Sequence, residues 1–416
     1  MFGRPISNRY KYYWYTVFTQ LRFTRIINII FVVQFLKFNL VQFGLLQSVF
    51  LLSQFALELP SGVLGDLFRK KAVIIWGLVL LTISPMVMIS ASLVGNNFMF
   101  TTLLGAFLLE GVGNALLSGA DEALFFEAIR RDGLAKQYAK IRGEAQFIGA
   151  IVVGAATFLG GVLYAINRVL PYFFQSLMVA VAGLVIFSVR EDKRITATIE
   201  KVKEPSQVKN ILTVFAEIKA STNVLSLFIF TALISAMVNA IFAMLPAYFS
   251  KLGFSSSANG LIFMLFSFVG GLVAAQAYRL TKVSSKTLAL VVAGILGLGV
   301  ILQMQASIYF FSAGVCLLYI TVDILDPIVL EMLNLWVKDS ARATLISGLS
   351  FATSLVTMLL NPLIGMLIQV YGTIPMLVMV SMFAIVMILF FVHFRLKSKN
   401  QNRKKANKVM DGKHID

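Results

Sequence analysis

Twelve apolar stretches dominate this sequence, each close to the roughly 20 residues that a helix needs to cross a bilayer. Hydrophobic residues make up 58% of the chain and charged residues 13%, whereas a soluble domain carries about 25% charge. A soluble core of this length cannot bury so much apolar surface, so hydrocarbon must solvate much of it. The sequence therefore predicts an all-α membrane protein. The expected helices span residues 12–35, 40–63, 72–94, 98–120, 143–165, 169–189, 224–248, 257–279, 286–306, 308–331, 343–368 and 374–394.

The placement of the basic residues predicts how the chain lies in the membrane. If twelve helices alternate in direction, 31 of the 36 Lys and Arg residues fall on one side and three on the other, with Arg22 and Arg25 inside the first helix. Basic residues are enriched in cytoplasmic loops. We therefore expect both termini in the cytoplasm of a bacterium, with the helices in its plasma membrane. The net charge of +17 is dispersed in short runs between apolar stretches, so the lipid bilayer, not nucleic acid, is the expected partner.

Few residues are available for metal, redox or phosphate chemistry. The chain has one cysteine, Cys316, and two histidines, His393 and His414. These are too few for an internal disulfide or a His-based metal site. The chain also lacks a Gly-rich phosphate loop ending in Lys. We expect no metal, no cofactor and no use of ATP.

A polar segment at residues 190–223 divides the chain into two sets of six predicted helices, at 1–189 and 224–396. Within the segment, Gln207 to Lys219 has the pattern of an amphipathic helix at the membrane interface. The tail, 397–416, is basic and polar. Two pseudo-symmetric six-helix bundles joined by a cytoplasmic linker are typical of secondary transporters.

A short motif after the second predicted helix makes the transporter interpretation more specific. Its Gly62, Gly65 and Asp66 are followed by the basic cluster that begins with Arg69 and Lys70. The motif resembles the cytoplasmic loop between helices 2 and 3 of the major facilitator superfamily. Two further stretches resemble bacterial exporters of drugs and metabolites in that family. They contribute Asp121 and Glu122 in the first half and Arg342 in the second. Arg142 stands at the place in the first half that corresponds to Arg342.

The resemblance has departures. Phe68 stands where the family loop has Gly, and the second-half copy of the loop has lost its acid. The helix at 143–165 has Gly149, Gly154, Gly160 and Gly161 but lacks the Pro that accompanies such glycines in family antiporters. The resemblance therefore implies the fold and alternating access, and it supports antiport less strongly.

Asp66 is the one acid of that basic loop, and two interpretations of it remain open. It can pair with Arg69 or a neighbouring loop and act as a charge latch that holds the cytoplasmic face in one conformation. Alternatively, the loop only sets topology. The acids and bases around Asp121, Glu122 and Arg142 are expected to form a gate or scaffold at the same face.

Charged residues at membrane depth are candidate functional residues, because each costs about 2.5–3.5 kcal/mol to insert. Arg22 and Arg25 are three residues apart, so a continuous helix presents both on one face. Glu110 reaches about the depth of Arg25 at the helical rise of 1.5 Å per residue. We expect Arg25 and Glu110 to pair, either as part of the coupling machinery or only to fix how two helices pack.

The second half offers fewer charges at depth. Asp323 is the better proton carrier, while Asp326 can serve as a structural acid, and Asp326-Pro327 is expected to break its helix locally. Buried amides either bind substrate or tie helices together. The candidates of this kind are Asn28, Asn114 and Asn239.

The sequence therefore predicts a monomeric secondary transporter of a small molecule, most simply a proton-coupled, multidrug-like exporter with Glu110 and Asp323 carrying protons. The alternative within transport is uptake or exchange of an organic anion bound by Arg22 and Arg25. Two other classes remain open, a membrane-embedded transferase and a non-transporting sensor that kept the fold. The sequence does not identify the substrate.

Overall fold

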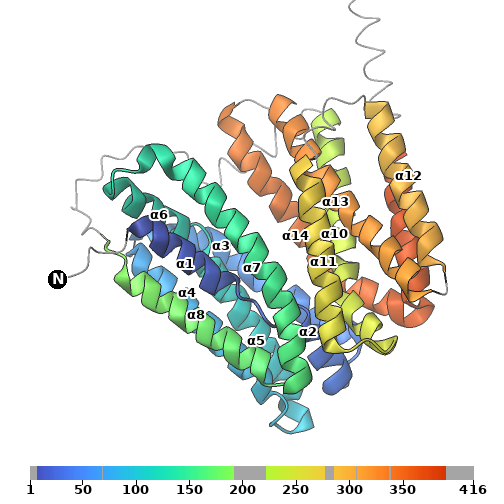
Figure 1. Cartoon of the computed structure of the whole chain (residues 1–416), viewed down its shortest axis with the longest axis horizontal. Helices are drawn as coiled ribbons and strands as arrows, with labels where there is room; N and C mark the ends of the chain where they lie inside the picture. The colour runs from blue at the N-terminus through green and yellow to red at the C-terminus, as the bar shows by residue number, and fades with distance from the viewer. Residues whose placement is uncertain are drawn as a thin grey trace, which may run out of the picture. The chain divides into compact units, whose positions relative to one another are not determined.

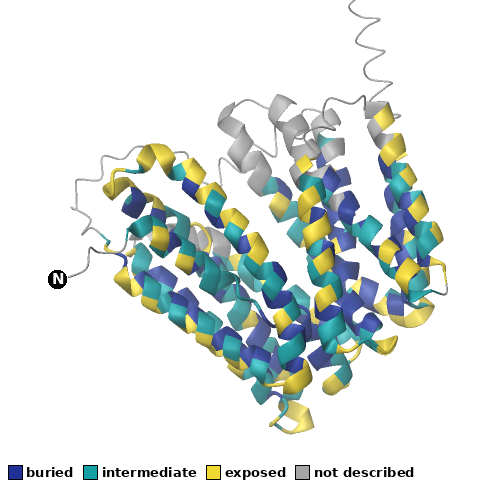
Figure 2. Cartoon of the chain, viewed as in Figure 1, coloured by how far each residue is buried: buried dark blue, intermediate teal, exposed yellow. Residues whose placement is uncertain are grey.

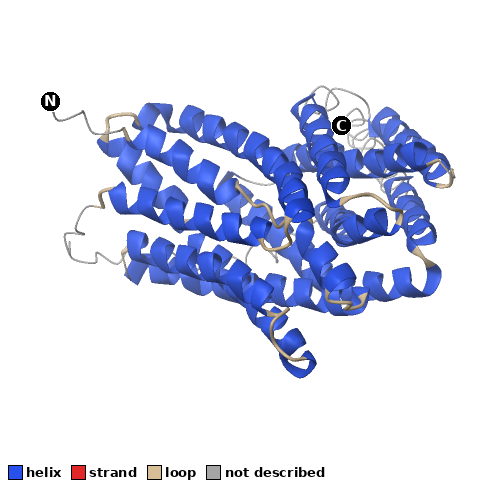
Figure 3. Cartoon of the chain, turned by 60° about the horizontal axis from the view of Figure 1, so that its bottom comes forward, coloured by secondary structure: helices blue, strands red, loops and turns tan. Residues whose placement is uncertain are grey.

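The computed structural model of the chain describes residues 7–67, 69–191, 222–276, 285–305, 307–336 and 339–389, with side chains left undescribed mainly at 58–67 and 325–347. Within these ranges the regular structure is helical throughout, as the blue ribbons of Figure 3 show. The all-α prediction is confirmed for this part of the chain. The amphipathic segment Gln207 to Lys219 and the tail 397–416 lie outside it.

The helices follow the predicted apolar stretches closely (Figure 1). Their bounds are α1 Asn8–Gln20, α2 Ile27–Ile29, the π-helix η1 Ile30–Phe35, α3 Leu40–Leu67, α4 Lys70–Ser90, α5 Asn96–Leu117, α6 Ala120–Arg131, the 3₁₀ turn η2 Ala135–Gln137, α7 Tyr138–Ile166, α8 Leu170–Ser188, α10 Thr222–Lys251, α11 Ser256–Gln276, α12 Ser285–Gln303, α13 Ile308–Trp336 and α14 Asp339–Tyr371. A last helix covers Thr373–Leu389.

Eight helices of the described chain are long and apolar enough to cross a membrane, and three shorter apolar helices occur in the second half. The first predicted helix, 12–35, is not among the eight, because it is divided into α1, α2 and η1. The total of twelve crossings therefore stays a prediction. Many large apolar side chains on the helices are exposed, such as Trp76 at 65% and Leu184 at 67%, and the yellow faces in Figure 2 mark such positions. In a membrane protein these faces contact lipid.

Two local predictions are wrong. A separate helix, α6, follows α5 on the cytoplasmic side of the predicted topology, after a turn at Gly119, whose φ of 77° suits glycine. Conversely, α13 runs through Asp326-Pro327 without a break in its helix. Proline is tolerated in membrane helices where neighbouring groups satisfy the freed carbonyl, and Pro85 and Pro246 also lie inside helices here.

Residue contacts group the chain into two compact units. The first comprises Met1–Glu200, Ala240–Phe268 and Thr357–Met366, and the second comprises Lys201–Asn239, Val269–Val356 and Leu367–Asp416. The first unit therefore includes segments from both predicted halves of the sequence, whereas the second unit begins only at Lys201. The predicted boundaries at 189, 223 and 396 remain predictions.

Close backbone approach joins α3 to the segment of α14 in the first unit. A Cβ on Gly44 would lie 2.6 Å from the carbonyl oxygen of Asn361, and one on Gly365 would lie 2.6 Å from that of Leu40. The Ser48 hydroxyl donates to the Met358 carbonyl at 2.5 Å. Only glycine permits such contact at both positions. We call this contact the α3–α14 seam.

A second pair of glycines makes a similar contact between α7 and α11. A Cβ on Gly260 would lie 2.8 Å from the carbonyl oxygen of Thr157, and one on Gly161 would collide with the carbonyl of Ser256. All four residues belong to the first unit. Two helix pairs, each containing one helix from either half of the sequence, thus meet through reciprocal glycines.

Candidate functional site

The first membrane helix is interrupted at Leu21 to Ile26. The α-helix ends at Gln20, four of the next six residues form turns, and the helix resumes at Ile27. The interruption is unexpected, because the sequence predicts one helix over 12–35. Non-helical backbone at membrane depth is tolerated only where other groups satisfy it, and in transporters it commonly lines a binding site.

Two neighbouring helices hold this unwound segment. The side-chain oxygen of Gln175 on α8 accepts hydrogen bonds from the backbone N–H of Thr24 at 3.0 Å and from its hydroxyl at 2.8 Å. On α7, Gly160 lies directly against the Phe23 carbonyl, where any Cβ would collide with it. Both Thr24 and Gln175 are buried. The break is therefore a built feature and not a frayed helix end.

A small cavity lined by both charged and apolar side chains lies beside the break, inside the first unit. Its volume is about 30 Å³, enough for about two water molecules, since one water needs roughly 10–15 Å³ by this measure. Arg22 donates to the Asn114 side-chain oxygen at 2.9 Å, and Glu110 lines the same cavity. The wall is completed by α1, α4, α5 and α8, through Thr19, Leu78, Leu81, Ser84, Leu117, Gln175 and Val179.

Arg22, and not Arg25, is therefore the arginine that shares a cavity with Glu110. The unwound segment removes the shared face that a continuous helix would give the two arginines. Arg22 lines the cavity with Glu110, while Arg25 is exposed. The ion pairs of the described residues include none between Glu110 and either arginine. The expected Arg25–Glu110 pair is replaced by an Arg22–Asn114–Glu110 group.

The other predicted residues at membrane depth are dispersed. The side-chain oxygen of Asn28, just after the break, is buried without a hydrogen-bond donor. In the second unit Asn239 is exposed, and the Asp323 carboxylate packs directly against the Cα of Gly270 on α11. Asp326 lies on α13, with its side chain outside the described set. None of the described side chains among these lines the cavity that Arg22 and Glu110 share.

The cytoplasmic motif is only partly described. Gly62, Gly65 and Asp66 fall in the last turns of α3, where side chains are not described, and the same holds for Arg342 in α14. Arg69 is exposed at the start of α4, and Lys70 forms an ion pair with Glu127 of α6. The latch proposed for Asp66 therefore remains untested.

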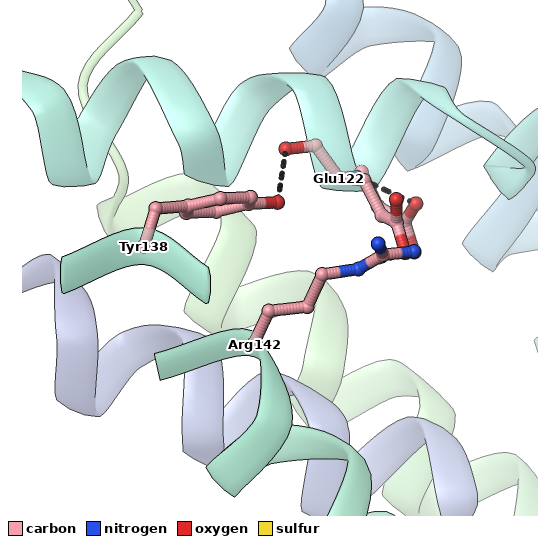
Figure 4. Close-up of polar contacts among 4 residues, drawn as sticks. Glu122, Tyr138 and Arg142 are labelled. Carbon is pink, nitrogen blue, oxygen red and sulfur yellow. Dashed lines mark hydrogen bonds and ion pairs between the residues drawn. The ribbon is translucent and has the colours of Figure 1, made fainter. Parts of the chain in front are cut away.

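Asp121 and Glu122 bind different partners at the start of α6. Glu122 accepts hydrogen bonds from Arg142 of α7 at 2.7 and 3.1 Å, and its backbone carbonyl lies 3.4 Å from the Tyr138 hydroxyl (Figure 4). Asp121 accepts a hydrogen bond from Tyr15 of α1 at 3.1 Å. Within the first unit, the contacts of these two acids fit a scaffold between helices.

The sequence did not single out three further residues of this face, Arg9, Tyr13 and Asp132. Tyr13 bonds to Glu144, which also pairs with Arg9 at 2.7 Å. Hydrogen bonds to Tyr13 and Glu144 raise the pKa of Arg9, so it stays charged. Asp132 accepts from the Ser7 hydroxyl, the Asn8 backbone N–H and the Asn8 amide, and so caps α1. For Asp132, the only signal in the sequence was its position as an acid within a basic loop.

Comparison with known proteins places this geometry in a family context. The family described as Major Facilitator Superfamily matches residues 16–302 and 227–413. An uncharacterised MFS-type transporter of Bacillus subtilis (strain 168), YxaM, is 24% identical over 385 residues, covering 85% of this chain and 87% of the relative.

Solved transporter structures share the fold. The nucleoside transporter NupG superposes with a TM-score of 0.73 at 14% identity, over 93% of this chain and 97% of that one. A bacterial homologue of the human lysosomal transporter Spinster, in an inward-facing and occupied conformation, gives a TM-score of 0.73 at 14% identity, over 94% and 97%. At these identities the likeness concerns the fold alone.

Proposed function

This chain belongs to the Major Facilitator Superfamily, and we propose that it exports a small molecule across the bacterial plasma membrane in exchange for protons. Family membership makes it a multi-pass membrane protein and a secondary transporter, and not an enzyme. The direction of transport, the coupling to protons and the multidrug-like substrate range belong to the proposal. So do the plasma-membrane location, the cytoplasmic termini and the monomeric state.

One observation carries the proton coupling: a half-buried carboxylate at membrane depth shares a small cavity with an arginine. Glu110 receives no side-chain hydrogen bond from the described residues, and Arg22 lies at the same cavity. Burial favours the neutral carboxylic acid, whereas the neighbouring guanidinium favours the carboxylate. Such opposed influences suit a group that gains and loses a proton during transport. Asp323 remains the second proposed proton carrier.

Flux in proteoliposomes tests this proposal, with ethidium as the probe. An imposed pH gradient should drive ethidium across the membrane in wild-type vesicles, and Glu110→Gln should reduce this flux about tenfold or more, equivalent to about 1.4 kcal/mol in the rate-limiting barrier. Glu191→Gln is the matched control, because Glu191 lies beyond the end of α8 and outside the cavity. Absence of gradient-driven movement, or equal flux in the Glu110 variant, would reject the proton role.

A second candidate, transport of an organic anion, is supported by Arg25. This residue lies in the unwound segment, is exposed, and forms none of the ion pairs found in the described chain. An unpaired guanidinium at membrane depth needs water or an anion beside it. Radiolabelled benzoate is a suitable probe: exchange that is lost in Arg25→Gln and kept in Lys37→Gln would favour this candidate over cation export.

The proposed latch at Asp66 gives a separate prediction. Asp66→Asn should insert and express normally, because the residue lies at a helix end, but it should transport about tenfold more slowly if the charge stabilises one conformation. Cysteine accessibility on the cytoplasmic face should shift at the same time. Normal flux with an unchanged accessibility pattern would leave the loop a topological signal only.

A further inference from the structure

Gln175 of α8 contacts both the unwound segment and the cavity that holds Arg22 and Glu110. Gln175 lines the cavity with Arg22 and Glu110, and it also accepts both hydrogen bonds from Thr24 in the break. Thr24 is 4% exposed and Gln175 is 8% exposed, so water does not replace these bonds readily. Neither residue was singled out from the sequence.

The chemistry of Thr24 fixes which end of the Gln175 amide faces the break. A backbone N–H can only donate, so the group it meets must be the amide oxygen. The amide nitrogen therefore keeps two N–H donors, which bind no acceptor in the described chain. The cavity offers acceptors for these donors, namely the Glu110 carboxylate and the water it has room for.

Few other charges act on Glu110. Arg22 faces it from α1, while α4 contributes Leu78, Leu81 and Ser84 to the wall, and α8 contributes Gln175 and Val179. Tyr172 of α8 and Arg22 are the titratable groups in electrostatic reach of Glu110 among the described residues. On the face of α5 that meets α3, Gly111 packs against Phe50 and Ser53, which carry no charge. The protonation state of Glu110 is thus the main electrostatic influence on the Gln175 side chain that can change.

We propose that Gln175 is a positioning residue that links the protonation of Glu110 to the conformation of the unwound segment carrying Arg25. With Glu110 charged, the amide nitrogen is attracted to the cavity while the oxygen holds Thr24. With Glu110 neutral, this attraction weakens, and Thr24 is held less firmly. The inference rests on the proposed function in one respect only: it takes the proton on Glu110 to be the proton that drives transport. The link itself needs no substrate.

Hydrogen–deuterium exchange of the full chain in detergent or nanodiscs tests the link at one fixed pH. Peptides covering Leu21 to Ile26 should exchange about tenfold faster in Gln175→Leu than in wild type, because Thr24 loses its acceptor. Glu110→Gln should speed exchange of the same peptides about fivefold, and it should add less than about twofold in the Gln175→Leu background. The effect of Glu110→Gln therefore depends on Gln175, and a glutamine with a merely structural role would not produce this dependence.

Three further variants complete the experiment. Gln175→Glu should restore most of the protection, because a carboxyl oxygen still accepts from Thr24. Thr24→Val, which removes only the hydroxyl, should speed exchange about threefold if Gln175→Leu does not fold. Ser176→Ala is the matched control, since it removes a buried hydrogen bond of the same helix, to Thr82 at 2.7 Å, away from the break.

Two results would overturn the link. One is wild-type exchange of the segment in both Gln175→Leu and Thr24→Val. The other is independent effects of Glu110→Gln and Gln175→Leu. Either can occur while ethidium flux still depends on Glu110, so failure of the link is distinguishable from failure of proton-coupled transport. A working link with no proton-driven flux would reject only the proposed function.

Discussion

Replacing Arg22 with Met should destabilise the protein by about 3 kcal/mol or more, because it leaves Glu110 at membrane depth without a basic neighbour in its cavity. Glu110→Gln should have a comparable cost, since it leaves Arg22 buried without its carboxylate. The double variant should recover much of the loss, because no uncompensated charge remains. Thermal unfolding in detergent, followed for all four proteins, measures the coupling between the two sites.

Arg25→Met is the matched control for this cycle. Arg25 has the same chemistry and lies three residues away, but it is exposed and does not line the cavity. Its replacement should change stability by less than about 1 kcal/mol. A larger loss for Arg25→Met than for Arg22→Met, or additive losses in the Arg22–Glu110 double variant, would contradict the assignment of Arg22 as the partner.

Alanine at Gly365 should open the α3–α14 seam. A Cβ there would lie 2.6 Å from the Leu40 carbonyl oxygen, which is backbone and cannot rotate away, so the two helices must separate. Cysteines placed by Ser48→Cys and Met358→Cys, in a Cys316→Ser background, should cross-link readily in the parent protein. Gly365→Ala should reduce the cross-linking rate about tenfold, as should Gly44→Ala, because a misplacement of about 1 Å is enough to disturb close contacts.

Gly105→Ala and Gly183→Ala are controls for the seam, because a Cβ at either position meets no atom within 4 Å. Both should cross-link as fast as the parent. If transport requires the seam to form and separate in each cycle, the Gly365 variant should also slow ethidium flux, while the two controls should not. Parent-like cross-linking in Gly365→Ala would show that the helices accommodate a side chain there.

The helical fold is readable from the sequence because the bilayer imposes one dominant rule. Every backbone polar group in hydrocarbon must be satisfied within its own helix, so an apolar run of sufficient length has one stable conformation. Helices α8 and α12 accordingly lie within a few residues of the predicted spans. Prediction failed for α6, which lies outside that rule. It is a 12-residue amphipathic helix whose stability comes from packing on its neighbours.

The break in the first helix could not be predicted for a related reason. Leu21 to Ile26 contains neither Gly nor Pro, and so nothing local signals an interruption. The conformation depends on Gln175 and Gly160, about 150 and 137 residues further along the chain. Once the break is missed, Arg22 and Arg25 share a face, and the wrong arginine pairs with Glu110. Charge type and depth identified the site, while its pairing required tertiary contacts.

The cap on α1 has a consequence for how this protein is made. Ser7 and Asn8 bond to Asp132, a residue 124 to 125 positions later. At a synthesis rate of about 5–20 residues per second, that carboxylate leaves the ribosome roughly 6–25 s after the start of the helix does. Until then the first membrane helix must insert with its N-terminal N–H groups uncapped. The cap therefore joins the earliest helix to the bundle only after the loop carrying Asp132 has been made. The nascent chain must reach at least this residue before the start of α1 can be fixed to its neighbours.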